Sequence, residues 1–470
     1  MRPTKHRTGR LATAAAAAAT ALALGLAACG GGTGGGGGGG EAAEAPEANA
    51  LDGVEGVTDV TFWHSMDGTN GEALNSLVEE FNTENDGVVE IEAVFQGNYD
   101  DTITKYKAAV QSGSTPDLVM IYDIGTRFMI DSQQAVPMQE FIDRDDYDVS
   151  DLQPNIAGYY TVDDQLWSMP FNTSMPVLYY NKTMFEEAGL DPEDPPGTLA
   201  EIRTAAEQLS AANGGPAEFG FGAAIYGWLV EQFIASSGAE YCNEGNGRDG
   251  KASEVLFDSP EAVELVTWWQ DMVADGLASN TGRDTPAAQN AFKAGQVAMT
   301  LESTGQVKGF TEAAEGVFEL GVGYYPKLEE NPSGPIIGGA SLWIGGEGHD
   351  AAQQEAAWRF VQFLAEPQTQ ATWHTTTGYF PISRGALELP EDVEWREQFP
   401  QFDVAVQQLE ETELNTATQG CALGVMPQAR KASEDGLEQA ILGADAQQSM
   451  TEAADSLQSA IEQYNSSTGG

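Results

Sequence analysis

The sequence predicts an α/β fold, because segments with strand periodicity alternate with segments of helical periodicity. Residues 57–63 and 89–95 place β-branched and aromatic residues at every second position, which is the period of a strand. Between them, residues 74–81 carry four large apolar side chains at the spacing of one helix face. This order favours largely parallel sheets, which bind ligands at the carboxyl ends of their strands.

The alternation continues along the chain. Residues 117–122 form a short apolar strand after a Thr-Pro turn, and Thr198 begins a helix with one apolar face. Ser259 and Pro260 supply the cap and the first turn of another helix, which we expect to end at Gly276. The roughly 400 residues that follow position 57 predict more than one domain.

The amino terminus has the pattern of a bacterial lipoprotein signal over residues 1–28. Four basic residues precede an alanine-rich apolar run that ends in Leu-Ala-Ala-Cys, so Cys29 is the predicted lipid attachment site. An uncleaved anchor is the alternative. Residues 29–56 are rich in Gly, Ala, Glu and Pro and predict a flexible tether. We therefore expect the protein on the extracellular face of the cell membrane, held there by its lipid anchor alone.

The chain is strongly acidic, with 21 Lys and Arg against 72 Asp and Glu and a formal net charge of −51 at pH 7. Such a surface is repelled by nucleic acid and by anionic lipid, so neither is an expected partner. A solvated acidic coat explains the composition better than cation binding does.

Two cysteines follow the predicted anchor, Cys242 and Cys421. In an oxidising compartment they can form one intramolecular disulfide, or they can be two buried thiols, since the sequence does not show whether they meet.

Motifs for catalysis and for metal or cofactor binding are missing from the sequence. The three histidines after the signal are far apart, and there is no phosphate loop, nucleophile elbow or dinucleotide fingerprint. The acidic run at residues 143–151 lacks the glycine and the distal glutamate of a calcium loop. These observations predict a binding protein without metal or cofactor rather than an enzyme.

Seven blocks of sequence resemble, in the same order, the glycerol-3-phosphate-binding proteins of ABC importers, a branch of the maltose-binding-like family. These blocks are residues 62–66, 97–99, 158–160, 170–182, 336–343, 377–382 and 426–428. The resemblance implies a type II periplasmic-binding-protein fold, in which hinge strands join two lobes. It places residues 57–172 with 300–343 in the first lobe and residues 173–299 with 344–466 in the second. It places the crossings between lobes near residues 172–176, 299–303 and 340–344.

The resemblance also implies the ligand-binding residues. In the family, a tyrosine and an acidic residue hold the glycerol hydroxyls, and these positions are Tyr99 and Asp123 here. The phosphate oxygens are met by two serines, a glycine amide, a tyrosine and an arginine, which correspond to Ser174, Ser303, Gly339, Tyr379 and Arg430. An arginine suits a phosphate because its planar fork meets two oxygens at once.

Two positions depart from the pattern of the glycerol-3-phosphate binders. Ile225 stands where they carry a tryptophan stacked on the ligand, and Asp123 replaces their glutamate. Relatives with these two features prefer glycerophosphodiesters such as glycerophosphocholine. Tyr226 or Trp228 could instead turn inward and supply an aromatic face.

Three functions follow from the sequence as alternatives. The first is a monomeric binding protein that delivers a glycerophosphodiester, or glycerol 3-phosphate, to two membrane permeases and a cytoplasmic ATPase. The second is an oligosaccharide-binding protein of the same fold. The third is an extracellular enzyme acting on phosphodiesters, which would need metal ligands that the sequence does not offer.

Overall fold

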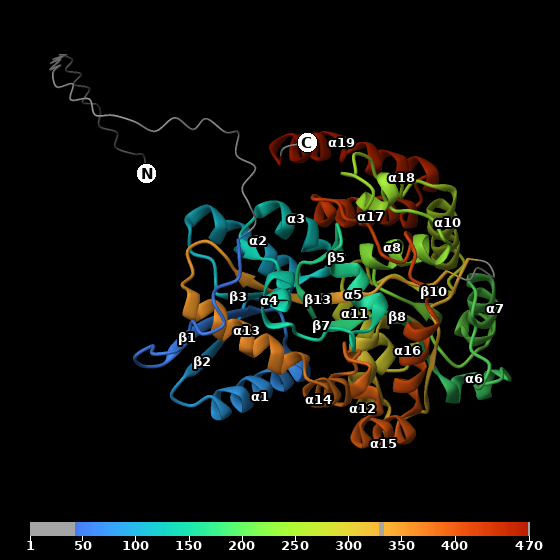
Figure 1. Ribbon diagram of the computed structural model, residues 1–470. Coiled ribbons are helices and arrows are strands. Elements are labelled where there is room, and N and C mark those ends of the chain that lie inside the picture. The colour runs from blue at the N-terminus through green and yellow to red at the C-terminus, as the bar shows by residue number, and fades with distance from the viewer. Residues whose placement is uncertain (1–42, 329–332, 469–470) are drawn as a thin grey trace, which may run out of the picture. The chain divides into compact units, whose positions relative to one another are not determined.

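The computed structural model of the protein describes residues 43–328 and 333–468 (Figure 1). The predicted signal peptide, the lipid attachment site Cys29 and the first part of the tether lie outside the described residues. The last part of the predicted tether is not a free linker, because Leu51 is buried and Arg144 Nη1 donates to the carbonyl of Pro46 at 2.7 Å. Packing against the folded body therefore begins before residue 57, where Leu51 and small alanines give the segment an apolar face.

The first sheet has parallel pairs at one end and antiparallel pairs at the other. Strand β1 (Thr58–His64) runs parallel to its neighbours β2 (Val89–Phe95) and β3 (Leu118–Tyr122). Strand β13 (Gly338–Gly345) runs antiparallel to β3, β4 (Ala135–Val136) and β7 (Met169–Ser174). Strand order is β2-β1-β3-β13-β4, with β7 paired to β13.

The second sheet combines parallel and antiparallel pairs around two long strands. Its order is β10 (Ala278–Ser279), β9 (Phe219–Gly222), β11 (Val297–Ser303), β8 (Pro176–Asn181) and β12 (Leu320–Gly323). A separate two-stranded hairpin joins β5 (Thr161–Val162) to β6 (Gln165–Leu166). Two mixed sheets with helices on their faces form the predicted type II, two-lobe binding-protein fold.

The helices follow the predicted periodicity where the sequence was clearest. The predicted apolar face at residues 74–81 lies within α1, and Thr198 caps α7 in a capping box with Glu201. Helices of the amino-terminal half are α1 (Gly68–Glu84), α2 (Tyr99–Ser112), α3 (Thr126–Ser132), α4 (Met138–Asp145), α5 (Pro154–Tyr160), α6 (Lys182–Ala188), α7 (Leu199–Leu209) and α8 (Gly227–Ser236). Those that follow are α9 (Asn243–Gly247), α10 (Pro260–Ala274), α11 (Thr285–Lys293), α12 (Val307–Ala314), α13 (Ala351–Ala365), α14 (Pro367–Thr377), α15 (Pro390–Gln398), α16 (Pro400–Glu411), α17 (Met426–Ile441), α18 (Ala446–Asp455) and α19 (Gln458–Ser467).

The chain passes from the first sheet to the second at Met175, where β7 ends and β8 begins. This passage is where a crossing was expected. The other two expected crossings are wrong, because residues 299–303 stay in the second sheet and residues 340–344 lie within the first. The return to the first sheet falls between β12 and β13.

Two parts of the predicted lobe division are corrected by these strands. Strands β11 and β12 pair with β8, so residues 300–323 belong to the second sheet rather than the first. Helix α13 packs on β1 and β13, as Figure 1 shows in orange, so residues 351–365 belong with the first sheet. The apolar face of α13 decides this, since Trp358 and Phe360 are fully buried there.

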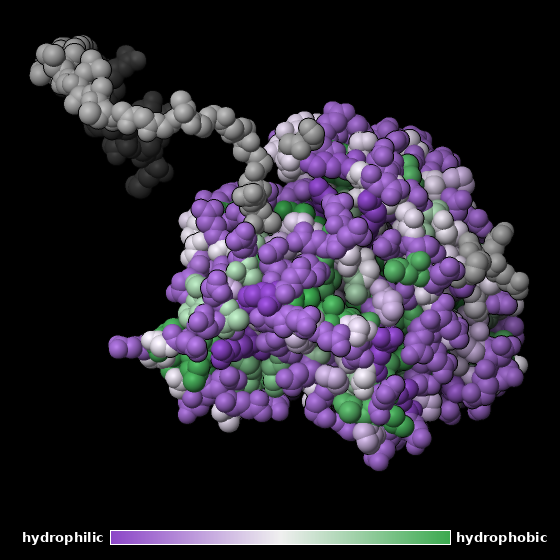
Figure 2. Space-filling model, in the orientation of Figure 1, coloured by the Kyte–Doolittle hydropathy of each residue, from purple (hydrophilic) through white to green (hydrophobic). Residues whose placement is uncertain are grey.

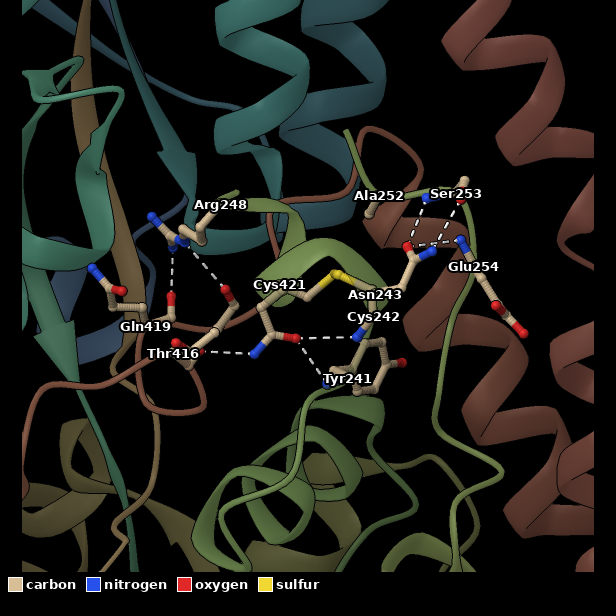
Figure 3. Close-up of a disulfide and its surroundings, with 12 residues drawn as sticks. Tyr241, Cys242, Asn243, Arg248, Ala252, Ser253, Glu254, Thr416, Gln419 and Cys421 are labelled. Carbon is tan, nitrogen blue, oxygen red and sulfur yellow. Dashed lines mark hydrogen bonds between the residues drawn. A yellow bond between two sulfur atoms is a disulfide. The ribbon is translucent and has the colours of Figure 1, made fainter. Parts of the chain in front are cut away.

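Cys242 and Cys421 form a disulfide across a sequence separation of 179 residues (Figure 3). Around it, the Asn246 side chain accepts from the backbone amides of Tyr241 and Cys242 and donates to the carbonyl of Thr416. The Arg248 guanidinium donates to the carbonyls of Gly420 and Gln419. The disulfide thus belongs to a larger junction that ties α9 to the segment before α17.

The visible face of the molecule is largely hydrophilic (Figure 2), as an acidic, water-exposed coat requires. Among the described residues, no helix combines the length and the apolar character needed to cross a membrane.

Candidate functional site

The site is centred on a buried ion pair between Asp123 and Arg430. Asp123 follows the carboxyl end of β3, and Arg430 lies in the first turns of α17. Arg430 Nη2 lies 2.5 Å from Asp123 Oδ2, and the two residues are 5 % and 3 % exposed. The pair therefore joins a strand end of the first sheet to a helix near the carboxyl end of the chain, far apart in sequence.

Glu231 is a second carboxylate on the same guanidinium, and the sequence did not identify it. It lies on α8 and is 1 % exposed. Its Oε2 accepts from Arg430 Nε at 2.9 Å and from Nη2 at 2.7 Å. A single glutamate in a helix that is otherwise mainly apolar was the available signal, because a buried charge needs a partner.

The three charged side chains of Asp123, Arg430 and Glu231 form a trio in which one cation lies between two anions. Burial raises the pKa of Asp123 and of Glu231, and the charge of Arg430 opposes that rise. Burial also disfavours the charged form of Arg430, but the two carboxylates outweigh it and hold the pKa of Arg430 well above its ordinary range. The guanidinium is thus a fixed positive charge in a water-poor site.

A tyrosine pair lies beside this trio. Tyr99 opens α2 and stacks on Tyr122 with ring centroids 5.5 Å apart. Asn172 Nδ2 donates to the Tyr99 hydroxyl at 2.7 Å, and the Tyr379 hydroxyl is near enough to raise the pKa of Tyr99. Burial raises the pKa of both tyrosines, so both stay neutral and can serve as hydrogen-bond donors.

The next feature of the site is a close approach between the backbones of β7 and β13. In the β7–β13 pairing, Ser174 lies opposite Gly338, and Thr173 lies opposite Gly339. Gly339 has φ +97°, and a Cβ there would lie 1.9 Å from the carbonyl oxygen of Asn172. Only glycine fits this position, which leaves the backbone of β13 uncovered by a side chain.

The turn that leads into α8 carries two aromatic rings, Tyr226 and Trp228, directly after Ile225. Ile225 is buried, and its amide donates to the carbonyl of Gly282. The charges of Arg430 and Asp123 act on the buried Tyr226 hydroxyl, and the Tyr226 and Trp228 rings lie 6.1 Å apart. Trp228 Nε1 is buried and has no hydrogen-bond partner among the described residues. Tyr226 and Trp228 therefore form the aromatic wall that an isoleucine at 225 does not supply.

The family model for bacterial extracellular solute-binding proteins matches residues 76–401. The chain belongs to this family. This solute-binding protein is 37% identical over 422 residues to the sn-glycerol-3-phosphate-binding periplasmic protein UgpB of Pectobacterium atrosepticum, covering 88% of this chain and 92% of the relative. The resemblance inferred from the seven sequence blocks is confirmed.

Solved structures match the fold over most of the chain. UgpB from Mycobacterium tuberculosis in complex with glycerophosphocholine superposes with a TM-score of 0.73 at 22% identity, covering 86% of this chain and 99% of that one. The cyclic alpha-maltosyl-1,6-maltose binding protein from Arthrobacter globiformis gives a TM-score of 0.69 at 24% identity, covering 87% and 100%. At these identities the match establishes the fold and leaves the ligand open.

The predicted site residues of this solute-binding protein do not all meet. Asp123 contacts Arg430, and Tyr99 lies near Tyr379, while Ser174 and Gly339 lie on the adjoining strands. Ser303 ends β11, where its hydroxyl accepts from the amide of Gly305 at 3.1 Å. Neither Ser303 nor Ile225 makes a hydrogen bond to Arg430 or Asp123.

Proposed function

We propose that this chain is the substrate-binding lipoprotein of an ABC importer and that it captures a glycerophosphodiester between its two lobes. In this proposal Cys29 carries the lipid that holds a monomer on the extracellular face of the membrane. The ligand is then passed to two permease subunits that a cytoplasmic ATPase drives. The buried Arg430, with a carboxylate of the first lobe against it, is the observation that carries the proposal.

Arg430 supplies the fixed cation that a phosphate needs. Its guanidinium can meet two phosphate oxygens at once, and Glu231 can hold it in place while Asp123 is exchanged for the ligand. Asp123, once released, can accept hydrogen bonds from the glycerol hydroxyls beside Tyr99. The phosphate would thus replace an internal carboxylate, so the charge of Arg430 stays compensated in both states.

Neutral donors surround the same position. Gly339 carries no side chain beside its amide, and within residues 43–328 and 333–468 the buried Trp228 indole N–H has no hydrogen-bond partner. A buried donor without a partner costs about 1–3 kcal/mol, and a ligand oxygen would recover it. Both groups favour an anionic, oxygen-rich ligand.

Relatives support a glycerophosphate ligand, and the local sequence favours the diester. The relative from Pectobacterium atrosepticum is named for sn-glycerol 3-phosphate, and the similar structure from Mycobacterium tuberculosis holds glycerophosphocholine. A diester carries one negative charge, whereas a monoester carries nearly two at pH 7. A site with one cation and two carboxylates suits the smaller charge.

An oligosaccharide remains the second candidate. The solved structure of the cyclic alpha-maltosyl-1,6-maltose binding protein has the same fold, and aromatic rings such as Tyr226 and Trp228 can stack on sugars. An enzymatic role receives less support, because the relatives in these comparisons are named as binding proteins.

Isothermal titration calorimetry with glycerophosphocholine, glycerol 3-phosphate and maltose separates the candidates. We expect tight binding of glycerophosphocholine, weaker binding of glycerol 3-phosphate and none of maltose. Binding of maltose alone would overturn the proposal in favour of the sugar. Release of glycerol phosphate from the diester in the presence of divalent metal would instead reveal an enzyme.

A further inference from the structure

The carboxyl-terminal helix α19 is attached to the lobe that contains the second sheet. Asn465 Nδ2 donates to the carbonyl of Ala252 at 2.9 Å, and Lys251 Nζ donates to the carbonyl of Thr468 at 3.1 Å. Residues 251–252 lead toward α10, which packs on β10 of the second sheet and on α17 and α18. Helix α19 therefore belongs to the second lobe.

One residue of this helix, Tyr464, packs against the segment that leads into α17. A Cβ placed on Gly424 would lie 1.9 Å from Tyr464 Cε1, so the tyrosine ring fills the space that a side chain at this position would need. Gly424 lies shortly before the first residue of α17, the helix that carries Arg430. The ring of Tyr464 thus rests on the start of the helix that presents the guanidinium.

The hydroxyl of Tyr464 reaches the other lobe. It donates to Asp131 Oδ2 on α3 at 3.0 Å, across a sequence separation of 333 residues. Helix α3 contacts β4 of the first sheet and directly follows the turn that begins at Asp123. Figure 1 shows α3, α17 and α19 at the same end of the molecule. Tyr464 therefore bridges the two elements next to the Arg430–Asp123 ion pair.

Asp131 has a cation of its own in Arg127. Arg127 Nη2 lies 2.8 Å from Asp131 Oδ1, and Arg127 Nε donates to Asp131 Oδ2 at 3.1 Å. The side chains of the two residues are 15% and 8% exposed. Because the arginine compensates the carboxylate, the Tyr464 hydroxyl can leave for water without uncovering an unpaired charge. The hydrogen bond between the lobes can therefore break and form again as the lobes move.

We propose that Tyr464, Asp131 and Arg127 form a latch that holds the two lobes together around a bound ligand. Tyr464 is then a positioning residue, which acts on the ligand through the elements that carry Arg430 and Asp123. The proposal rests on ligand capture between the lobes, and it adds a contact that sets the lifetime of the complex. None of the seven sequence blocks includes the three residues of the latch.

The position of the latch predicts which rate constant depends on it. A hydrogen bond from α19 to α3 exists only while the lobes are together, so it stabilises the closed form and not the encounter with the ligand. Loss of the bond should therefore raise the dissociation rate and leave the association rate nearly constant. A residue that merely supports the fold would not separate the two rate constants in this way.

The test removes the hydroxyl and keeps the ring. We expect Tyr464→Phe to raise the dissociation rate of glycerophosphocholine on the order of 5-fold in stopped-flow fluorescence, with the association rate within about 2-fold of that of the unmodified protein. Tyr180→Phe is the matched control, because the Tyr180 hydroxyl donates to the carbonyl of Pro192 at 2.7 Å within the second lobe. This control should leave both rate constants nearly unchanged.

A double variant tests whether the hydrogen bond itself is the link. Asp131→Ala should also raise the dissociation rate, and adding Tyr464→Phe to it should raise the rate little further, since both changes remove the same bond. Effects that multiply in the double variant would overturn the latch. An equal acceleration in Tyr180→Phe would overturn it as well, because the effect would then come from a general loosening of the protein.

The remaining outcomes separate the latch from the proposed ligand. If the unmodified protein binds glycerophosphocholine and Tyr464→Phe releases it at the same rate, the latch is overturned and the function stands. If the unmodified protein does not bind glycerophosphocholine, the proposed function is overturned. The same comparison with maltose, the ligand of the second candidate function, then tests the latch, because Tyr464 acts through the lobes and not through the chemistry of the ligand.

Discussion

At the scale of single residues, Arg430 is the side chain on which ligand capture depends most directly. Arg430→Ala should abolish detectable binding of glycerophosphocholine, because a buried phosphate would be left without its cation at a cost of about 3 kcal/mol or more. Arg430→Lys should restore little, since an ammonium does not reproduce the planar fork that also holds Glu231. Calorimetry on the three proteins measures the effect.

A surface arginine provides the control for this prediction. Arg283 forms ion pairs with Glu434, Asp435 and Glu438, which lie on α17 as Arg430 does. The Arg283 side chain is 27% exposed. Arg283→Ala should keep the affinity within a few-fold, because surface ion pairs contribute about 1 kcal/mol or less. Affinity close to that of the unmodified protein in Arg430→Ala would mean that the phosphate lies elsewhere.

The sequence proposed site residues that lie in recognisable motifs, and it did not identify Glu231, which no motif contains. Asp123 was assigned from its place at the end of a strand, and Arg430 from its place after a Met-Pro-Gln block. In the structure the two side chains form an ion pair. Glu231 was missed because its role depends on a contact across 199 residues. The direction in which Tyr226 and Trp228 point was also open, because the backbone of the turn decides it.

At the scale of elements, the contact between β7 and β13 depends on Gly339. Gly339→Ala should lower the free energy of unfolding by on the order of 3 kcal/mol, because its Cβ would overlap the Asn172 carbonyl and its φ of +97° disfavours a side chain. Gly316→Ala is the matched control, with φ +70° and no atom within 4 Å of the new Cβ. Urea unfolding measures both, and equal losses would contradict the steric argument.

The disulfide is the second element-scale feature with a measurable effect. Replacing Cys242 and Cys421 together by serine should lower the free energy of unfolding by about 2–5 kcal/mol, because the crosslink closes a long loop in the unfolded chain. Reductant should destabilise the unmodified protein by a similar amount and leave the double variant unchanged. A reductant effect of the same size in both proteins would show that the disulfide is not its target.

Local periodicity located the elements well, whereas the assignment of elements to sheets could not be read from it. Strand β2 occupies residues 89–95 as predicted, and the caps of α7 and α10 lie at Thr198 and Ser259. The sequence of β11 is that of a buried strand and would fit either sheet. The structure places it in the second sheet, where Ser303 pairs with Pro176 of β8. Pairing between distant strands carries little signal in a single sequence.

At the scale of the whole molecule, several contacts besides the site link elements that pack with different sheets. The Tyr464 hydroxyl on α19 donates to Asp131 on α3 at 3.0 Å, and Asn155 on α5 donates to the carbonyls of Leu409 and Thr412. The Arg430–Asp123 ion pair, at 2.5 Å, is a further contact of this kind. A ligand that replaces Asp123 as the partner of Arg430 would therefore bind a molecule in which several weak contacts already hold elements of the two sheets together.

The formal net charge of −51 at pH 7 gives the last prediction, which concerns the field of the whole protein rather than any one contact. A nearly dianionic ligand, glycerol 3-phosphate, is repelled during its approach, whereas zwitterionic glycerophosphocholine is not. Added salt shortens the Debye length to about 10 Å at 0.1 M. Salt should therefore raise the association rate of glycerol 3-phosphate and leave that of glycerophosphocholine nearly constant.

Stopped-flow fluorescence can follow both rates through Trp228, which lies in the aromatic wall of the site. The control is Arg283→Ala, which changes the net charge by one unit without removing the guanidinium of Arg430 and should leave both salt dependences in place. If the glycerol 3-phosphate rate instead falls as salt is added, the attraction of Arg430 reaches the approaching ligand more strongly than the repulsion of the acidic coat. The charge of the whole chain would then have no part in selecting the diester, and selection would lie with the contacts inside the cleft alone.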